Sequence, residues 1–155
     1  MLKSVAELMT RDPITVKTET PLRDTIKIMA EKGISGLPVV DDTGKLIGII
    51  SETDLMWQQA GVTPPAYFMI FDSVIYLKNP LEYERELHKA LGQTVGEVMS
   101  KKPITISPEK PLREAAKILR DKKIHRLPVV NDSEEIVGIL SLSDIIRDMA
   151  QSQSS

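Results

Sequence analysis

The chain has 155 residues, of which 41% are hydrophobic and 27% charged, a composition typical of a globular protein. Its net charge of -2 argues against a nucleic-acid-binding protein, because such proteins usually carry a basic surplus. The absence of cysteine excludes disulfides, zinc–thiolate sites and thiol nucleophiles. The sequence shows no signal-peptide core and no apolar run as long as a membrane span, so we expect a cytoplasmic protein without a membrane partner.

Residues 1–60 predict a mixed α/β unit. The first expected elements are a helical lead-in at 5–9, a strand at 14–16 and a helix that begins after Thr20 and Pro21. Strands at 37–40 and 46–51, joined by a turn at 41–44, follow. A last helix, capped by Thr53 or Asp54, runs to about Ala60. Strands that flank a crossover helix pair in parallel, whereas strands joined by a tight turn form a hairpin. The unit should therefore contain one parallel and one antiparallel pair.

Residues 57–94 predict a helical insert, and all six aromatic residues of the chain lie there. Two helices are expected, the first from apolar spacing and the second from the N-cap Asn79 followed by Pro80. The apolar face of the first helix consists of Tyr67, Ile70, Phe71, Val74 and Leu77. The second helix is expected to end at Gly92. This helical hairpin should cover a subdomain or a dimer seam. The alternative is an aromatic wall that lines a ligand pocket or docks a partner.

The remaining residues repeat the first unit. Residues 95–146 align with 5–56 at a constant offset of 90 without a gap, and 23 of the 52 positions are identical. Because one copy would bury little apolar surface by itself, the two copies should pack against each other. The expected division is a first repeat at 1–60, the insert at 61–94, a second repeat at 95–150 and a disordered tail at 151–155.

The sequence lacks the motifs of common catalytic sites. It contains no GxxxxGK[ST] loop and no GxGxxG after a strand. Two histidines without cysteine argue against catalytic triads and metal clusters. We therefore expect a protein that is not an enzyme and holds neither metal nor cofactor.

The phrases SETD at 51–54 and SLSD at 141–144 close the last strand of each copy and begin its last helix. Ser, Thr and Asp are preferred helix N-caps, so a purely structural role explains both phrases. The same place also suits a ligand, because a helix N-terminus favours phosphate and a carboxylate can accept both hydroxyls of a ribose. Both interpretations stay open at this point.

His125 and Arg126 distinguish the second copy from the first. They stand in IHRLPVVND, whereas the first copy reads ISGLPVVDD with Ser35 and Gly36 in these places. Arginine offers a planar fork for phosphate, and histidine can add a donor. The alternative is a pair of polar residues at the exposed start of a strand.

The repeated phrases resemble those of tandem CBS domains, a pair called a Bateman module. Both copies carry MT/MS-x-x-PIT-[VI], then [GK]-I-x-x-LPVV-[DN], then [IV]-G-I-[IL]-S-x-[TS]-D. The resemblance implies an α/β fold in which two repeats of strand, helix, strand, strand and helix, each with a three-stranded sheet, are related by a pseudo-twofold axis. It also implies two clefts for adenosine-containing ligands and, commonly, a homodimer that forms a flat disc of four domains.

The resemblance assigns ligand roles to positions in both copies. Asp54 and Asp144 would hold the ribose hydroxyls. The phosphate would lie near Thr53, Ser143, His125 and Arg126, and the base would lie against backbone at Thr15, Gly36 and Pro38 in the first copy and at Thr105, Arg126 and Pro128 in the second. Because the first copy lacks the basic pair, the two clefts need not be equally occupied.

The expected function is regulation: the module binds AMP, ADP or ATP and signals to a separate effector protein through a change in shape or assembly. S-adenosylmethionine and cyclic di-AMP stay open as ligands. A dimerisation scaffold without a ligand is the alternative from another class. A nucleotide-hydrolysing enzyme is least favoured, because the sequence identifies no base, metal cluster or nucleophile.

Overall fold

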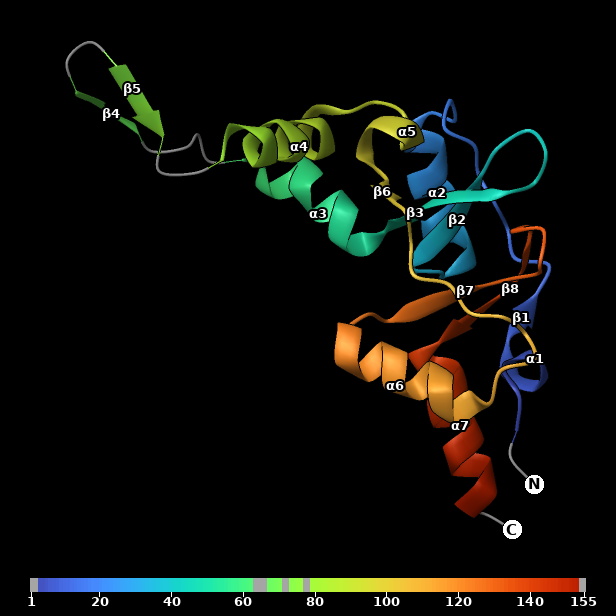
Figure 1. The fold of residues 1–155 in the computed structure, drawn as a ribbon. Helices are drawn as coiled ribbons and strands as arrows, with labels where there is room; N and C mark the ends of the chain where they lie inside the picture. The colour runs from blue at the N-terminus through green and yellow to red at the C-terminus, as the bar shows by residue number, and fades with distance from the viewer. Residues whose placement is uncertain (1–2, 63–66, 71–72, 77–78, 154–155) are drawn as a thin grey trace.

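The computed structural model describes residues 3–62, 67–70, 73–76 and 79–153, and it forms two stacked halves (Figure 1). The first repeat holds α1 (Val5–Leu8), β1 (Thr10–Arg11), α2 (Leu22–Lys32), β2 (Gly36–Val40), β3 (Leu46–Ser51) and α3 (Glu52–Ala60). The second repeat holds α5 (Val95–Val98), β6 (Ser100–Lys101), α6 (Leu112–Lys122), β7 (Arg126–Val130), β8 (Ile136–Ser141) and α7 (Leu142–Gln153). The predicted α/β class, with a three-stranded sheet in each half, is confirmed.

Each sheet combines two strands of one repeat with a short strand of the other. The orders are β2-β3-β6 and β1-β8-β7, and every pair is antiparallel. Thr10 pairs with Ile139, and Ser100, its counterpart ninety residues later, pairs with Ile49. The exchange is therefore reciprocal, as a pseudo-twofold relation between the repeats requires.

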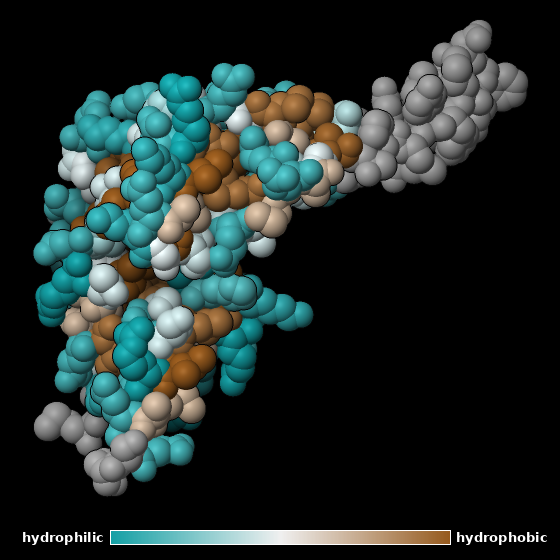
Figure 2. Space-filling view, turned by 180° about the vertical axis from the view of Figure 1, so that it is seen from behind, coloured by the Kyte–Doolittle hydropathy of each residue, from teal (hydrophilic) through white to brown (hydrophobic). Residues whose placement is uncertain are grey.

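The exchange extends to the hydrophobic cores. Val5 and Met9 from the start of the first repeat are buried in the core beneath β7 and β8, with Leu127 and Leu140. The core beneath β2 and β3 receives two residues from α5 in the same way, Val95 and Val98. Because burial of apolar surface is the main stabilising term, each half depends on the lead-in of the other. The view from behind in Figure 2 shows apolar residues at the surface where the two halves meet.

Two glycines give the exchanged strands room to approach. A Cβ on Gly138 would lie 3.0 Å from the backbone oxygen of Thr10, and a Cβ on Gly48 would lie 3.0 Å from that of Ser100. Such a contact is tighter than nine in ten real Cβ contacts, so the neighbouring backbone would have to give by a few tenths of an ångström. These two glycines of the repeated phrases therefore allow β1 and β6 to lie close to the strands of the other repeat with which they pair.

The predicted parallel strands are reduced to single bridges. Val16 bridges Val39 in parallel, and Ile106 bridges Val129 at the equivalent place. The predicted strand at 14–16 is therefore wrong as a sheet member, since Thr10–Arg11 and Ser100–Lys101 fill the third places. The prolines that follow, Pro13 and Pro103, lack the N–H that a longer ladder needs.

The first part of the insert forms strands. β4 (Tyr67–Ile70) and β5 (Ser73–Tyr76) pair antiparallel with Tyr67 opposite Tyr76, so the prediction of a helix here is wrong. Aromatic and β-branched residues favour strands, and this preference outweighs the helical spacing of the apolar residues. Phe71 and Leu77 lie outside the described residues.

The second part of the insert is the expected helix, α4 (Pro80–Leu91). The side chain of Asn79 accepts a hydrogen bond from the backbone N–H of Leu81 at 2.9 Å, which confirms the predicted N-cap. Gly92 follows the helix but has a φ of -62°, so it is not the left-handed terminator that the sequence suggests. Its buried position beside Val98 leaves no space for a side chain.

The C-terminal segment is more regular than expected. α7 continues to Gln153, and the hydroxyl of Ser152 donates to the carbonyl of Asp148 at 3.0 Å. The prediction of a disordered tail from residue 151 is therefore wrong as far as Gln153, because helical hydrogen bonds continue through these polar residues.

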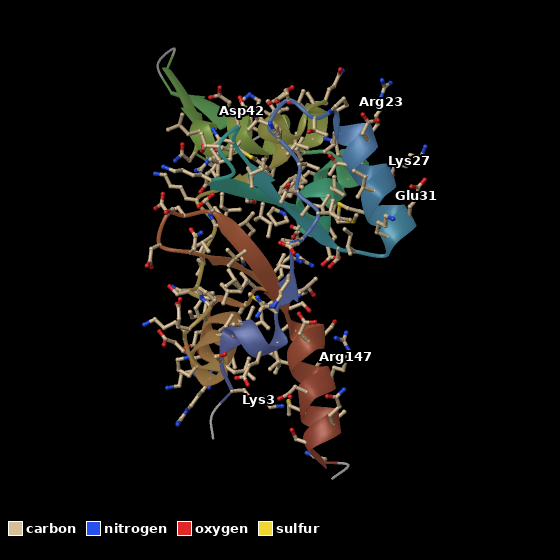
Figure 3. All side chains as sticks on the ribbon, turned by 90° about the vertical axis from the view of Figure 1, so that its right-hand side faces the viewer. Lys3, Arg23, Lys27, Glu31, Asp42 and Arg147 are labelled. Carbon is tan, nitrogen blue, oxygen red and sulfur yellow. The ribbon has the colours of Figure 1, made fainter. Side chains whose placement is uncertain are left out.

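Charged side chains cover the outer face of α2, among them Arg23, Lys27 and Glu31 (Figure 3).

Candidate functional site

Two hollows lie between the repeats at positions related by the offset of 90. The Thr53 cleft has a volume of about 350 Å³ and is lined by Thr53 together with Ile104 and Pro128 of the other repeat. The Asp144 cleft has a volume of about 440 Å³ and is lined by Asp144 together with residues of the first repeat that include Ile14 and Pro38. Both volumes fall in the range of small-ligand pockets.

The Asp144 cleft brings together five of the predicted site residues: Gly36, Pro38, Arg126, Ser143 and Asp144. The Thr53 cleft brings together four: Thr53, His125, Arg126 and Pro128. Thr105 lines a separate hollow, and Thr15 lines neither cleft. Asp54 is buried and does not line the Thr53 cleft.

Asp144 stands at the start of α7 with one oxygen committed to the backbone. Its Oδ2 accepts from the N–H of Ser141 at 2.9 Å, and the hydroxyl of Ser141 accepts from the N–H of Asp144 at 3.2 Å. This reciprocal arrangement is the capping box expected of a Ser-x-x-Asp phrase. Among the described residues, Oδ1 has one charged partner, Arg147 at 3.3 Å; the Asp144 side chain is 10% exposed and that of Arg147 is 66% exposed. Asp144 lines the cleft, and this cation can be released into solvent.

Asp54 occupies the equivalent place at the start of α3 but is enclosed. Ser51, not Thr53 or Asp54, is the N-cap, and its N–H donates to Oδ2 of Asp54 at 3.0 Å. Oδ1 accepts from Lys89 Nζ at 2.6 Å and from the hydroxyl of Ser100 at 2.8 Å. The side chain is 6% exposed. The Asp144 side chain is 10% exposed, so the two aspartates differ less in exposure than in their partners: Oδ1 of Asp54 accepts from Lys89 and Ser100, whereas Oδ1 of Asp144 accepts from Arg147.

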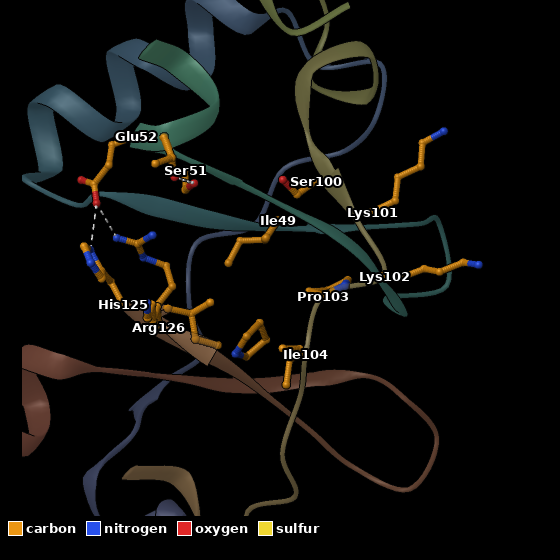
Figure 4. Close-up of a pocket in the computed structure, with 14 residues that line it drawn as sticks. Ile49, Ser51, Glu52, Ser100, Lys101, Lys102, Pro103, Ile104, His125 and Arg126 are labelled. Carbon is orange, nitrogen blue, oxygen red and sulfur yellow. Dashed lines mark hydrogen bonds and ion pairs between the residues drawn. The ribbon is translucent and has the colours of Figure 1, made fainter. Parts of the chain in front are cut away.

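A three-membered charged cluster crosses the Thr53 cleft (Figure 4). Arg126 donates to Oε1 of Glu52 at 3.1 Å, and His125 Nδ1 lies 3.7 Å from the same oxygen. Glu52 was not among the predicted site residues. Its signal in the sequence is that the first copy has a carboxylate where the second copy has Leu142.

Arg126 lies between the two clefts and lines both. Its side chain passes over Gly36, where an added Cβ would lie 2.7 Å from Arg126 Cδ, and its guanidinium also donates to the hydroxyl of Ser35. Positions 36 and 126 are equivalent in the repeat, so two large side chains would compete for this space near the pseudo-twofold axis. The glycine in one copy therefore permits the arginine in the other.

The exchanged sheets and paired clefts define a tandem α/β ligand-binding module, and comparison with known proteins identifies its family. The family profile of the CBS domain matches residues 5–61 and 95–151. The chain therefore belongs to the CBS domain family. The match falls on the two copies of the repeat and leaves out the β4–β5 hairpin and α4.

Relatives support the same assignment. The chain is 32% identical over 158 residues to the chloroplastic CBS domain-containing protein CBSX1 of Arabidopsis thaliana, with 98% of this chain and 66% of that protein covered. It is 32% identical over 143 residues to the uncharacterized protein MJ1426 of Methanocaldococcus jannaschii, with 88% and 85% covered. The crystal structure of CBSX2 in complex with AMP superposes with a TM-score of 0.81 at 27% identity, and 96% of this chain and 97% of that chain are covered.

Two further observations concern the described residues only. None of their helices combines the length and apolarity that crossing a membrane requires. Across residues 3–62 and 79–153, no three His, Cys, Asp or Glu side chains come together as a metal site would need.

Proposed function

We propose that this protein is a regulatory CBS pair that binds an adenosine-containing ligand, AMP, ADP or ATP, in the Asp144 cleft. The observation that carries the proposal is the position of Asp144: its carboxylate caps α7 with one oxygen and presents the other edge to a cleft. A carboxylate held in this way can accept the two hydroxyls of a ribose. The complex of the structural relative CBSX2 with AMP supports the same ligand class.

The remaining contacts follow from the lining of the cleft. The base lies against Gly36 and Pro38, the phosphate lies near Ser143, and Arg126 supplies a charged donor from the other repeat. Since Arg126 lines both clefts, its guanidinium can turn from Glu52 toward a phosphate in the Asp144 cleft. Thr15 and Thr105 have no role in this arrangement.

The test is a calorimetric panel of adenosine, AMP, ADP, ATP, S-adenosylmethionine and cyclic di-AMP on the wild type and on Asp144→Asn. The amide can still accept from Ser141, so the variant keeps the cap and loses the charge. Hydrogen bonds to a charged acceptor contribute about 1.5–3 kcal/mol each, so we expect about tenfold or greater loss of affinity. Asp121→Asn on the exposed end of α6 is the control.

A second variant separates the phosphate from the nucleoside. Arg126→Ala should weaken AMP and ATP but leave adenosine unchanged, because only the phosphate needs the guanidinium. Tightest binding of S-adenosylmethionine or cyclic di-AMP would reassign the ligand. A panel in which no ligand binds would leave the dimerisation scaffold as the function.

The proposal extends to assembly and output. The chain acts without catalytic activity, forms a homodimer in the cytoplasm, and passes ligand occupancy to an effector protein by shifting the population of its conformations. Exposed apolar residues at equivalent positions of α3 and α7, Met56 and Ile146, support a dimer face on these helices. Hydrolysis of ATP by pure protein, abolished by a point substitution, would contradict the absence of catalysis.

A further inference from the structure

Lys89 of the insert helix α4 makes three contacts, one with the first repeat and two with the start of the second. Its ammonium donates to Asp54 Oδ1 at 2.6 Å, to the carbonyl of Val98 at 3.0 Å and to the hydroxyl of Ser100 at 3.3 Å. A lysine has three donors, so all of them are used inside the protein. The side chain is 24% exposed, which limits competition from water.

Asp54 has correspondingly little capacity left. Both of its oxygens accept bonds from within the chain, Oδ2 from Ser51 and Oδ1 from Lys89 and Ser100. A ribose would have to replace Lys89 or Ser100 at Oδ1, because its hydroxyls need the same lone pairs. Replacing the lysine would also leave its ammonium without a carboxylate partner in a place where the side chain is only 24% exposed, which disfavours the exchange.

The backbone of α4 holds Lys89 in position. The side-chain amide of Gln58 in α3 donates to the carbonyl of Lys89 and, at 3.3 Å, to that of Gly92. The end of the insert helix is therefore attached to α3, the same helix that Asp54 caps. Withdrawal of Lys89 requires either a new side-chain rotamer or movement of α4.

Asp144 provides the internal comparison. Its cation, Arg147, lies on the same helix at 3.3 Å and is 66% exposed. Because the exposed Arg147 side chain can be hydrated once it is released, a ligand can displace it at little cost. The two equivalent carboxylates thus differ in whether an internal cation encloses them.

We propose that Lys89 determines which cleft accepts a ribose: it withholds Asp54, so the chain binds one nucleoside, in the Asp144 cleft. The Asp54 side becomes a second nucleoside site only when Lys89 leaves. This inference rests on the proposed function, since it concerns the same class of ligand. In this proposal the insert makes the two clefts, which lie at equivalent positions of the repeat, differ in their ability to bind a nucleoside.

The first experiment measures the stoichiometry of AMP by calorimetry on the full chain. The wild type should bind one AMP per chain and Lys89→Met two, whereas Lys89→Met combined with Asp54→Asn should return to one. Arg147→Met, which removes the corresponding cation of the other carboxylate, is the matched control and should keep a single site. A Lys89→Met variant that is folded, as judged by its thermal melt, and still binds one AMP would overturn the proposal.

A second measurement uses only isosteric changes and covers the case in which Lys89→Met does not fold. Asp54→Asn in the wild-type background should leave the affinity for AMP within about twofold, whereas Asp144→Asn should reduce it about tenfold or more. Two AMP per wild-type chain, one of them lost in Asp54→Asn, would overturn the role of Lys89 and keep the proposed function. If neither the wild type nor Lys89→Met binds AMP, ADP or ATP, both proposals are wrong.

Discussion

Arg126 and Glu52 lie 74 positions apart in the chain, yet the guanidinium of one meets the carboxylate of the other at 3.1 Å across the Thr53 cleft. Each repeat supplies one member of the pair. Arg126 is 11% exposed and Glu52 is 46% exposed, so the glutamate can be hydrated when the pair separates. A phosphate bound in the Asp144 cleft would replace Glu52 as the partner of the arginine.

Replacement of Glu52 by glutamine should therefore strengthen the binding of phosphorylated ligands. A partly exposed ion pair contributes about 0.2–1 kcal/mol, so we expect a Kd for AMP that is lower by a factor of about 1.4 to 5 and no change for adenosine. Titration calorimetry on both ligands measures the difference. Glu31→Gln on the outer face of α2 removes the same charge far from the clefts and should change neither (Figure 3). Weaker binding of AMP by Glu52→Gln would mean that Glu52 helps to hold the ligand.

Substitution of glycine should separate structural glycines from site glycines. Gly138→Ala places a methyl group against the backbone of Thr10, which cannot move without opening the contact between β1 and β8. Overpacking of this kind costs about 1–3 kcal/mol, and thermal unfolding should show the loss. Gly36→Ala meets only the flexible side chain of Arg126, so it should lower stability less and weaken AMP binding instead. Equal losses of stability in the two variants would contradict this distinction.

The turn between β2 and β3 should give the protein a measurable acid dependence. The hydroxyl of Thr43, followed by the backbone N–H groups of Lys45 and Thr43, lowers the pKa of Asp41 from its ordinary value of 3.8. The stability that the ionised group contributes is present above pH 3.8 and is lost as the pH falls through the lowered pKa of the folded state.

Asp41→Asn removes this dependence while it keeps an acceptor. Asn131 holds the equivalent turn through its side-chain oxygen, which accepts from Ser133 and Glu135 at 3.0 Å each. We expect the wild type to be more stable than Asp41→Asn at higher pH and to lose this difference in stability as the solution becomes acidic. Thermal melts across the acid range measure the difference. Melting curves of the two proteins that differ by a constant amount at every pH would refute the assignment.

The exposed apolar residues of α7 should support dimerisation. Ile146 is 64% exposed and Met149 is 56% exposed, a pattern that favours a covered face in the assembled protein. Ile146→Asp should therefore shift the protein toward monomers in light-scattering measurements at moderate concentration. Arg113→Asp on α6 is a control for added charge. An unchanged dimer in the α7 variant would place the contact elsewhere.

The sequence predicts most of the fold because the repeat doubles every local signal. Strand and helix limits in both copies follow from the same apolar periods and turn residues, and the structure has β3 at the predicted 46–51. The exchange of β1 and β6 is not predictable in this way. Two-residue strands carry no period, and Thr10 alone does not indicate whether its partner lies in its own repeat or in the other.

The candidate site shows where a motif stops being informative. The Asp of S-x-[TS]-D marks both carboxylates, but access to Asp54 depends on Lys89, which comes from an insert that the motif does not include. The sequence singles out His125 and Arg126 as a difference between the copies, and their role at a phosphate stays a prediction. Its partner Glu52 was missed, because in the sequence it stands beside two good N-cap residues and resembles an ordinary first-turn acid.

The reciprocal exchange also determines which piece of the protein can be transplanted. A single repeat cut out for fusion to an enzyme would lack the third strand of its sheet and two residues of its core. The pair is therefore the smallest portable unit. Lys3 near the start of the chain, labelled in Figure 3, forms an ion pair with Asp148 in α7. A short tether could therefore join these two regions. New chain ends could then be opened between β4 and β5, and both clefts would be retained in a rearranged protein.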